Sequence, residues 1–247
     1  MSLLHNLSPS ASIVFLTGAG ISAESGLETF RGAGGLWCDH RVEDVATPEA
    51  FEQDPELVHT FYNMRRTGLL NAAIQPNPAH KALAKLEEKW NGKVLIITQN
   101  IDDLHERGGT KNLLHMHGEL LKAFCVHCSH GTGTKIECQM DLSTDTVCPA
   151  CGQKNGLRPD IVWFGEMPYH MDAISIALSN CDLFVAIGTS GNVYPAAGFV
   201  REALSAGATT IEMNLEPSLN ASVFDQSIVG PAGTTVPQLV ETLLKNS

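Results

Sequence analysis

The chain has 247 residues, of which 43% are hydrophobic and 17% charged, so it can bury the core of one large or two unequal domains. This composition excludes a disordered tail and a coiled coil. Its 27 acidic residues outnumber its 16 Lys and Arg, and the formal net charge is −11. Phosphate backbones and anionic lipids repel such a chain, so we expect no nucleic acid and no membrane surface as a partner.

The N-terminal stretch has no targeting signal that we recognise. The first basic residue is Arg31, so the positive segment of a signal or transit peptide is missing. The apolar run at residues 13–16 is too short to span a bilayer, and no later run reaches the roughly 18 residues that a span needs. We therefore expect a cytoplasmic protein.

Short apolar runs that end in small or polar residues are typical of buried parallel strands. They occupy residues 13–16, 94–97, 113–116, 183–187 and 209–213. Helix-like stretches lie at residues 48–70, 78–90, 168–180, 194–206 and 236–245. Prolines at 48, 78 and 168 stand where a first helical turn favours them, and Pro195 is placed similarly. The alternation predicts an α/β fold with a doubly wound parallel sheet.

Two stretches interrupt this alternation. Residues 38–75 carry helix signals without a strand, and residues 121–157 hold two cysteine pairs in a turn-like context. We expect both to be insertions that together form a smaller domain. Residues 1–37, 76–120 and 158–247 then form the α/β domain.

A glycine-rich loop follows the first predicted strand. Gly18, Gly20 and Ala23 fit the dinucleotide-binding pattern G-x-G-x-x-[G/A], after which a helix N-terminus would offer N–H groups to phosphate. A tight strand-to-helix turn is the structural alternative. A dehydrogenase would also place an acidic residue after a second strand about 20 residues on. No strand signal precedes Asp39, which weakens a hydride-transfer function.

Polar side chains follow two further predicted strands. Residues 98–103 read Thr-Gln-Asn-Ile-Asp-Asp, and such groups at a strand's carboxyl end suit ribose hydroxyls or a carboxamide, although a helix N-cap is also possible. His115 and His117 end the next strand and share a face. A lone histidine is more often structural. The glycine after His117 and the converging polar strand ends make it the candidate general base.

The cysteines have the spacing of a metal site. Two C-x-x-C pairs, Cys125 with Cys128 and Cys148 with Cys151, are separated by 19 residues. Four thiolates complete a tetrahedral shell, so we expect a structural rather than a catalytic zinc ion, with a redox pair as the alternative. Three further cysteines are expected to be free thiols: Cys38, Cys138 and Cys181.

Tyr62 and Arg65 lie three residues apart in a helix-like stretch and so share a face. A phenol hydroxyl beside a guanidinium group can bind a carboxylate. Periodicity alone favours the simpler interpretation, a solvated helix face.

This ordered set of motifs closely resembles the sirtuins, the NAD-dependent protein lysine deacylases, over roughly residues 10–245. The motifs are residues 18–22, 29–31, 98–102 and 117–118, the two cysteine pairs, residues 162–166 and 188–190, and Asn214. The resemblance implies a Rossmann-like domain that binds NAD and a small domain built from a helical module, residues 38–75, and a zinc module, residues 121–157. Acylated lysine would enter the cleft between them.

The resemblance also implies a reaction in which NAD is consumed. The acyl oxygen attacks the nicotinamide ribose, nicotinamide leaves, and His117 acts as general base on a ribose hydroxyl. The products are free lysine, nicotinamide and O-acyl-ADP-ribose. The acidic residue of dehydrogenases is not needed for this chemistry.

Residue by residue, the resemblance assigns contacts to the two ligands. For NAD they are Gly18, Ala19, Gly20, Ser22, Ala23, Thr29, Phe30, Arg31, Trp37, Gln99, Asn100, Ile101, Asp102, Gly188, Thr189, Ser190, Asn214, Leu215, Glu216 and Ala232. For the substrate peptide they are Val162, Trp163, Phe164 and Gly165, which would pair with it as an added strand.

Three positions distinguish subgroups. Many sirtuins have aspartate where this chain has Thr29, and an apolar pair where it has Tyr62 and Arg65. The chain resembles the class III subgroup, of bacterial type, that removes succinyl and malonyl groups as well as acetyl. The small residues around Ala33 fit a longer acyl chain. Hydrogen bonds from Arg65 to the distal carboxylate would contribute roughly 1.5–3 kcal/mol.

Two other functions remain as alternatives. A Rossmann oxidoreductase would need an acidic ribose ligand and a hydride acceptor site, and the sequence offers neither. A non-catalytic ADP-ribose or acyl-lysine binding module would be favoured if Asn100 or His117 were replaced, and both are present. The favoured oligomeric state is a monomer.

Overall fold

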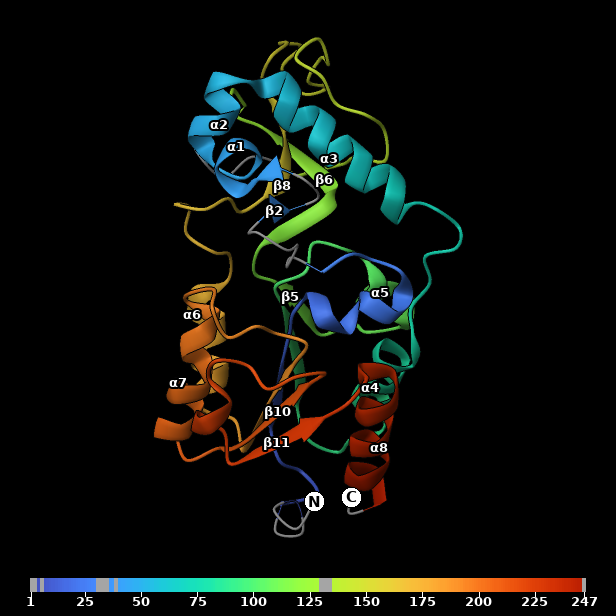
Figure 1. Ribbon diagram of the computed structural model, residues 1–247, viewed down its shortest axis with the longest axis vertical. Helices are drawn as coiled ribbons and strands as arrows, with labels where there is room; N and C mark the ends of the chain where they lie inside the picture. The colour runs from blue at the N-terminus through green and yellow to red at the C-terminus, as the bar shows by residue number, and fades with distance from the viewer. Residues whose placement is uncertain (1–3, 5–6, 30–35, 38–39, 129–134, 246–247) are drawn as a thin grey trace.

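The computed structural model describes residue 4 and residues 7–29, 36–37, 40–128 and 135–245. A six-stranded parallel sheet forms the centre of the larger lobe, in the order β11-β10-β9-β1-β4-β5 (Figure 1). Its strands are β1 (Ile13–Thr17), β4 (Val94–Thr98), β5 (Leu113–His115), β9 (Leu183–Ile187), β10 (Thr209–Asn214) and β11 (Gln226–Val229). The doubly wound parallel sheet is confirmed. Its topological switch point lies between β1 and β9, where ligands of such sheets bind.

Helices cover both faces of the sheet, which explains the continuous apolar strands (Figure 1). On one face, α4 (Pro78–Lys89) and α8 (Ala232–Lys245) pack on Ile13 and Phe15 of β1. On the other, α6 (Met171–Leu178) and α7 (Phe199–Ser205) pack on Val14 and Leu16. Every residue of β1 is buried, so alternate side chains belong to two separate cores.

The predicted helix over residues 48–70 is two helices, α2 (Pro48–Gln53) and α3 (Pro55–Leu69). Pro55 disfavours the helical conformation at Asp54, the residue before it, and so ends the first helix. The Asp54 carboxylate then accepts the N–H of Leu57 at 3.0 Å and caps the second helix.

Other helices also begin at residues that differ from the sequence-based prediction. The glycine loop is followed by two 3₁₀ turns, residues 19–21 and 23–25, rather than an α-helix, and Gly26 ends them at a φ of +91°. α8 begins at Ala232, four residues earlier than predicted, where Glu24 accepts the N–H of Gly233 at 2.8 Å. A 3₁₀ turn at residues 196–198 precedes α7. The short helix α5 (Leu104–Gly108) lies between β4 and β5.

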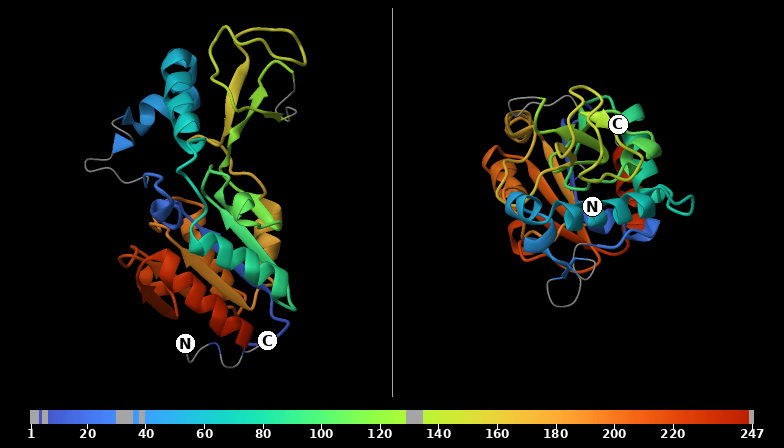
Figure 2. Two further views of the ribbon diagram at one scale, coloured as in Figure 1. Left: turned by 90° about the vertical axis from the view of Figure 1, so that its right-hand side faces the viewer. Right: turned by 90° about the horizontal axis from the view of Figure 1, so that it is seen from above.

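The smaller lobe combines two distant segments of the chain. Its antiparallel sheet has the order β7-β6-β8, formed by β6 (Gly118–Cys125), β7 (Ile136–Glu137) and β8 (Leu157–Ile161). α1 (Val42–Val45), α2 and α3 lie beside these strands (Figure 2). One core joins the helices and the strands, with Val45, Phe61, Leu120 and Ile161 among its buried members.

Strands occur where the sequence indicated none. β2 (Leu36–Trp37) pairs antiparallel with β3 (His40–Arg41), and β6, β7 and β8 enter the stretch predicted as turn-like. The β2–β3 pair is separate from the parallel sheet, so it does not create the acidic position of a dehydrogenase. The domain boundaries predicted at residues 120 and 157 fall within β6 and at the start of β8. Within the described residues, no helix is both long and apolar enough to cross a membrane.

Candidate active site

A cavity of about 1010 Å³ is lined by residues of both lobes. That volume lies at the upper end of the range for small-molecule pockets, roughly 300–1,000 Å³, so it suits a dinucleotide together with part of a second ligand. The loops after β1, β4, β9 and β10 form its floor, at the carboxyl ends of the parallel strands.

The glycine loop meets the loop after β9 at the switch point. Gly18 donates its N–H to Ile187 at 3.0 Å, and Gly20 donates to the carbonyl of Gly188 at 2.9 Å. A Cβ on Gly20 would lie 2.7 Å from the Cα of Gly188, closer than side chains tolerate. This close approach of two main chains is the arrangement that a dinucleotide-binding turn requires, so these residues fit NAD.

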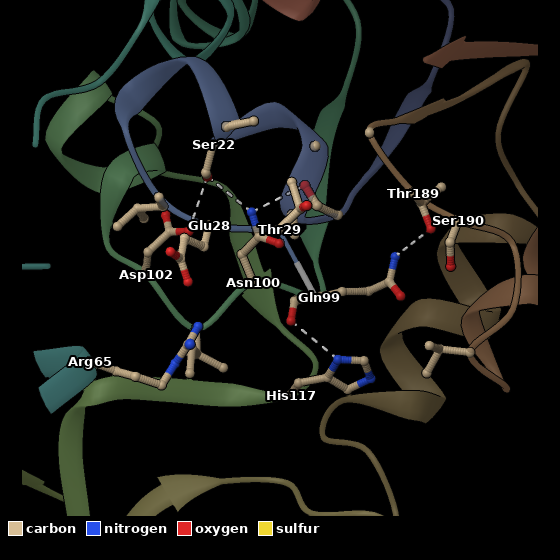
Figure 3. Close-up of a pocket in the computed structure, with 18 of the residues that line it drawn as sticks. Ser22, Glu28, Thr29, Arg65, Gln99, Asn100, Asp102, His117, Thr189 and Ser190 are labelled. Carbon is tan, nitrogen blue, oxygen red and sulfur yellow. Dashed lines mark hydrogen bonds between the residues drawn. The ribbon is translucent and has the colours of Figure 1, made fainter. Parts of the chain in front are cut away.

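Three polar side chains connect the glycine loop to the loop after β4 (Figure 3). Asn100 Nδ2 donates to Ser22 Oγ at 3.1 Å and to the carbonyl of Gly18 at 3.2 Å. Ser22 Oγ in turn donates to Asp102 at 3.0 Å. Burial raises the pKa of Asp102 to about 6, against the opposing hydrogen bonds from Leu104 and Ser22. The network fixes the amide and carboxylate groups at the cavity wall.

The opposite side of the cavity is built around Thr189. Gln99 Nε2 donates to its hydroxyl at 3.0 Å, and Asn214 Nδ2 donates to its carbonyl at 3.0 Å. These bonds link the loops after β4, β9 and β10 into one rigid edge.

His117 lies just after β5, and its Nδ1 is 3.1 Å from the carbonyl oxygen of Gln99 (Figure 3). A carbonyl only accepts, so Nδ1 carries the proton, and in the neutral ring the lone pair is on Nε2. Burial lowers the pKa of His117, and the hydrogen bond that its Nδ1 donates to the carbonyl of Gln99 opposes this by raising the pKa. A neutral imidazole that lines the cavity can accept a proton from a ligand.

α3 contributes Tyr62 and Arg65 to the cavity wall. Tyr62 is only 1% exposed, so the interpretation as a solvated helix face is wrong for it. Its hydroxyl accepts the indole N–H of Trp163 at 3.0 Å, and burial raises its pKa. Arg65 is half-buried and enters the cavity from the side opposite Thr189 (Figure 3).

The segment at residues 162–166 forms a turn after β8 that also lines the cavity. The N–H of Val162 donates to the main-chain carbonyl of His117 at 2.9 Å, and the N–H of Phe164 donates to the carbonyl of Ala46 at 3.0 Å. Glu166 accepts the main-chain N–H of Trp163 at 2.8 Å. These N–H groups are therefore engaged within the chain, and Phe164 is 45% exposed.

Arg158 supports this turn from the β8 side. It donates to both carboxylate oxygens of Glu166, at 2.8 and 2.9 Å, and its guanidinium carbon is 3.5 Å from the centre of the Trp163 ring. Sequence reasoning missed this role, because only the contact with Trp163, five residues on, reveals it.

Comparison with known proteins identifies the family. The model of the Sir2 family matches residues 18–195, well over half of the chain. The chain belongs to the Sir2 family, the sirtuins. It is 57% identical to a protein of Bdellovibrio bacteriovorus named NAD-dependent protein deacylase, over 94% of this chain and 97% of that protein.

Solved structures agree with this sirtuin's fold. A Sir2 homologue in complex with NAD is 37% identical and has a TM-score of 0.87, and the similarity covers 100% of this chain and 95% of that chain. A complex described as Sir2 with a p53 peptide and NAD⁺ is 29% identical, with a TM-score of 0.81 over 98% of this chain and 95% of that chain.

The sirtuin's four paired cysteines, Cys125, Cys128, Cys148 and Cys151, form a compact cluster in the small lobe. The Sγ atoms of Cys125 and Cys151 are 3.8 Å apart, those of Cys128 and Cys148 are 3.5 Å apart, and all four lie within 4.8 Å of one another. Thiolates on a tetrahedral zinc ion, with Zn–S of about 2.3 Å, are spaced by about 3.8 Å, so the cluster fits a structural zinc. Cys138 and Cys181 are buried free thiols, and Cys38 lies outside the described residues.

The cavity collects the predicted ligand contacts of this sirtuin that the structure describes, together with His117, Tyr62 and Arg65. Phe30, Arg31 and Ala33 lie outside the described residues, and only the main chain of Trp37 is described. The cavity also has lining residues that the sequence did not indicate, among them Glu28, Phe61, Leu120, Tyr194 and Pro231. Phe61 is adjacent to Tyr62 on α3, and the others carry no motif.

Proposed function

We propose that this sirtuin is an NAD-dependent protein lysine deacylase that removes acetyl groups and also the acidic succinyl and malonyl groups. The observation that carries this proposal is the position of His117. His117 lines the same cavity as the glycine loop, which fits a dinucleotide, and as Tyr62 and Arg65, which suit an acidic acyl group. The relative of Bdellovibrio bacteriovorus, named NAD-dependent protein deacylase, supports the NAD-dependent deacylase part of this proposal.

NAD, when bound, supplies the ribose carbon to which the acyl oxygen is transferred as nicotinamide leaves. We assign its phosphates to the loop of Gly18, Ala19 and Gly20, and its nicotinamide ribose to Asn100 and Asp102. Thr189, Ser190 and Asn214 would contact the adenosine half. Hydrogen bonds among these side chains orient them before NAD binds, so binding requires little further ordering of the side chains.

His117 would take a proton at Nε2 from a ribose hydroxyl. The carbonyl of Gln99 holds the proton at Nδ1 and so keeps the lone pair on the nitrogen that the reaction needs. The lowered pKa of His117 keeps the ring neutral at physiological pH. A general base of this kind contributes typically 10²–10⁴-fold to the rate.

The acyl-lysine protein would bind along residues 162–165, as an added strand. Because the N–H groups of Val162, Trp163 and Phe164 are already engaged, pairing would use the carbonyls of this segment and the N–H of Gly165. Such pairing reads few side chains, so broad protein specificity would follow. Arg65 would donate to the distal carboxylate of succinyl-lysine.

We further propose two domains as in the sequence-based division, except that all of β6 and β8 belongs to the small domain, which the zinc ion holds together. A monomer in the cytoplasm is the proposed working form.

The proposal is tested with an acetyl-lysine peptide and NAD, by following nicotinamide and O-acyl-ADP-ribose with mass spectrometry and NADH by its absorbance. We expect both products and no NADH. NADH formation would favour an oxidoreductase, and tight ADP-ribose binding without turnover would favour a binding module.

A further inference from the structure

His115 and His117 hydrogen-bond two consecutive carbonyls of the loop after β4. His117 Nδ1 lies 3.1 Å from the oxygen of Gln99, and His115 Nδ1 lies 3.1 Å from the oxygen of Asn100. The two rings differ at the other nitrogen. His117 lines the cavity, whereas His115 Nε2 is 2.8 Å from a carboxylate oxygen of Glu106.

Both partners of His115 are acceptors, which determines its protonation state. A carbonyl oxygen and an ionised carboxylate cannot donate, so only an imidazolium, with a proton on each nitrogen, satisfies both contacts. A neutral ring would direct a lone pair at one of the two acceptors. The ionised carboxylate of Glu106 is the stronger acceptor and keeps the remaining proton, so the bond to the carbonyl of Asn100 is the one that is lost. His115 is 8% exposed, so water cannot readily replace the lost bond.

The carbonyl that His115 holds belongs to a residue of the NAD-facing wall. Asn100 is fixed at three further points: its N–H donates to Thr98 Oγ1 at 3.0 Å, and its side chain donates to Ser22 and to the carbonyl of Gly18. The bond from His115 therefore completes the set that fixes both the main chain and the amide of Asn100. It links α5, which carries Glu106, to the glycine loop through Asn100.

We propose that His115, as an imidazolium held by Glu106, is a positioning residue that fixes Asn100 for NAD, and that loss of its second proton sets the alkaline limit of the reaction. For its activity readout this inference rests on the proposed function. His117 must be neutral to act as a base, while His115 must be charged to position Asn100. Two histidines two residues apart thus work in opposite protonation states.

The charges around His115 favour its protonated form. Glu106 on α5, Glu119 on β6 and Asp102 after β4 are acidic, and Lys122 on β6 is neutralised by Glu119 at 2.7 Å. His105 of α5 and His170 before α6 are two further titratable groups near His115, and burial lowers the pKa of both, which favours their neutral forms. Burial lowers the pKa of His115, but the bond and charge of Glu106 and the charge of Glu119 outweigh it, and the net pKa is raised above 6.5.

Because the pKa of His115 is raised in the folded protein, its contribution to stability and activity falls as the pH rises. The stabilisation from the His115 contacts is complete below the unfolded pKa near 6.5 and is lost as pH rises through the higher folded pKa. The reaction should therefore decline on the alkaline side with the pKa of His115, and on the acid side with that of His117.

The first test is independent of activity. Long-range ¹⁵N–¹H spectra of the histidine rings should show His115 titrating above 6.5 and His117 below it. A His115→Asn variant assigns the His115 signals by their disappearance. A His115 ring that carries a single proton near neutral pH, or that titrates below His117, overturns the proposal.

The second test uses Glu106→Gln, with Glu88→Gln as a control. Glu88 is an exposed residue of α4, so the control makes the same charge change away from the site. In Glu106→Gln, the His115 titration and the alkaline limb of kcat/KM for NAD should move to lower pH together, by the same amount. KM for NAD should rise at alkaline pH more than KM for the peptide. An alkaline limb that stays in place while the His115 titration moves overturns the proposal.

The third test uses His115→Asn again, to separate positioning from packing. The side-chain amide of His115→Asn can still donate to the carbonyl of Asn100 but does not titrate, so its activity should persist where the wild type declines. A variant that keeps the wild-type alkaline limb contradicts the proposal. If no acyl-lysine is turned over at all, the proposed function fails, and the pH dependence of ADP-ribose affinity in Glu106→Gln then tests the positioning role by itself.

Discussion

The indole N–H of Trp163 donates a hydrogen bond to the phenol oxygen of Tyr62, at 3.0 Å, across 101 residues of sequence. An indole nitrogen only donates, so the Tyr62 oxygen accepts here and its own proton is directed away from Trp163. Arg158 and Glu166 hold Trp163 in turn. Contacts in the core of the small lobe therefore fix the orientation of the Tyr62 hydroxyl.

Tyr62→Phe removes this hydroxyl but keeps the ring. We expect kcat/KM for succinyl-lysine to fall about tenfold, because one hydrogen bond to the acyl carboxylate is lost, while acetyl-lysine is affected less. The unpaired indole N–H should also lower the free energy of unfolding by about 1–3 kcal/mol. Peptide kinetics and urea unfolding measure the two effects. Tyr169→Phe, which loses a hydroxyl outside the cavity lining, is the control and should not change the acyl preference.

Arg65→Met tests the carboxylate receptor more strongly. Loss of a charge-assisted contact worth roughly 1.5–3 kcal/mol should lower kcat/KM for succinyl-lysine by about ten- to a hundredfold relative to acetyl-lysine. Arg65→Lys keeps the charge but not the planar fork, and should be intermediate. Equal losses for both acyl groups would show that Arg65 is only structural.

His117→Ala should abolish removal of every acyl group while the fold and ADP-ribose binding persist. In the wild type, activity should hold through neutral pH and fall on acidification below 6.5, because burial lowers the pKa of the folded-state base. Stability should decline in the same range, since the unfolded chain takes up a proton that the folded one does not. More than a few per cent residual activity in the variant would remove His117 from the catalytic role.

Zinc removal should act on the small lobe first. We expect metal analysis to find one zinc ion per chain, and a strong chelator to speed hydrogen exchange in β6 and β8 before the parallel sheet, with loss of activity. The structural role would be refuted by a metal-free protein, or by activity that survives zinc removal unchanged.

Local sequence patterns predicted the parallel sheet and the cysteine cluster well. β1 is apolar along its whole length because both its faces are buried, and that is a pattern a single segment displays. β11 was missed because its residues alternate between half-buried and exposed at the sheet edge. Family motifs, rather than periodicity, indicated the cavity residues.

The supporting contacts could not be predicted, since they join segments far apart in the chain. Nothing near Tyr62 in the sequence indicates that Trp163 will meet it. His115 was placed on the same face as His117, but its different role depends on Glu106, which packs beside it only in the folded chain. The break between α2 and α3 at Asp54 could have been predicted locally, because Pro55 disfavours a helical conformation at the residue before it.

The most direct measurement of the central claim is a competition between acetyl-lysine and succinyl-lysine forms of one peptide, followed by mass spectrometry with and without NAD. We predict that both acyl groups are lost only with NAD, that nicotinamide and O-acyl-ADP-ribose appear in step, and that the succinyl form is consumed efficiently beside the acetyl form. Release of acyl groups without NAD, or no turnover of either peptide, would contradict the account.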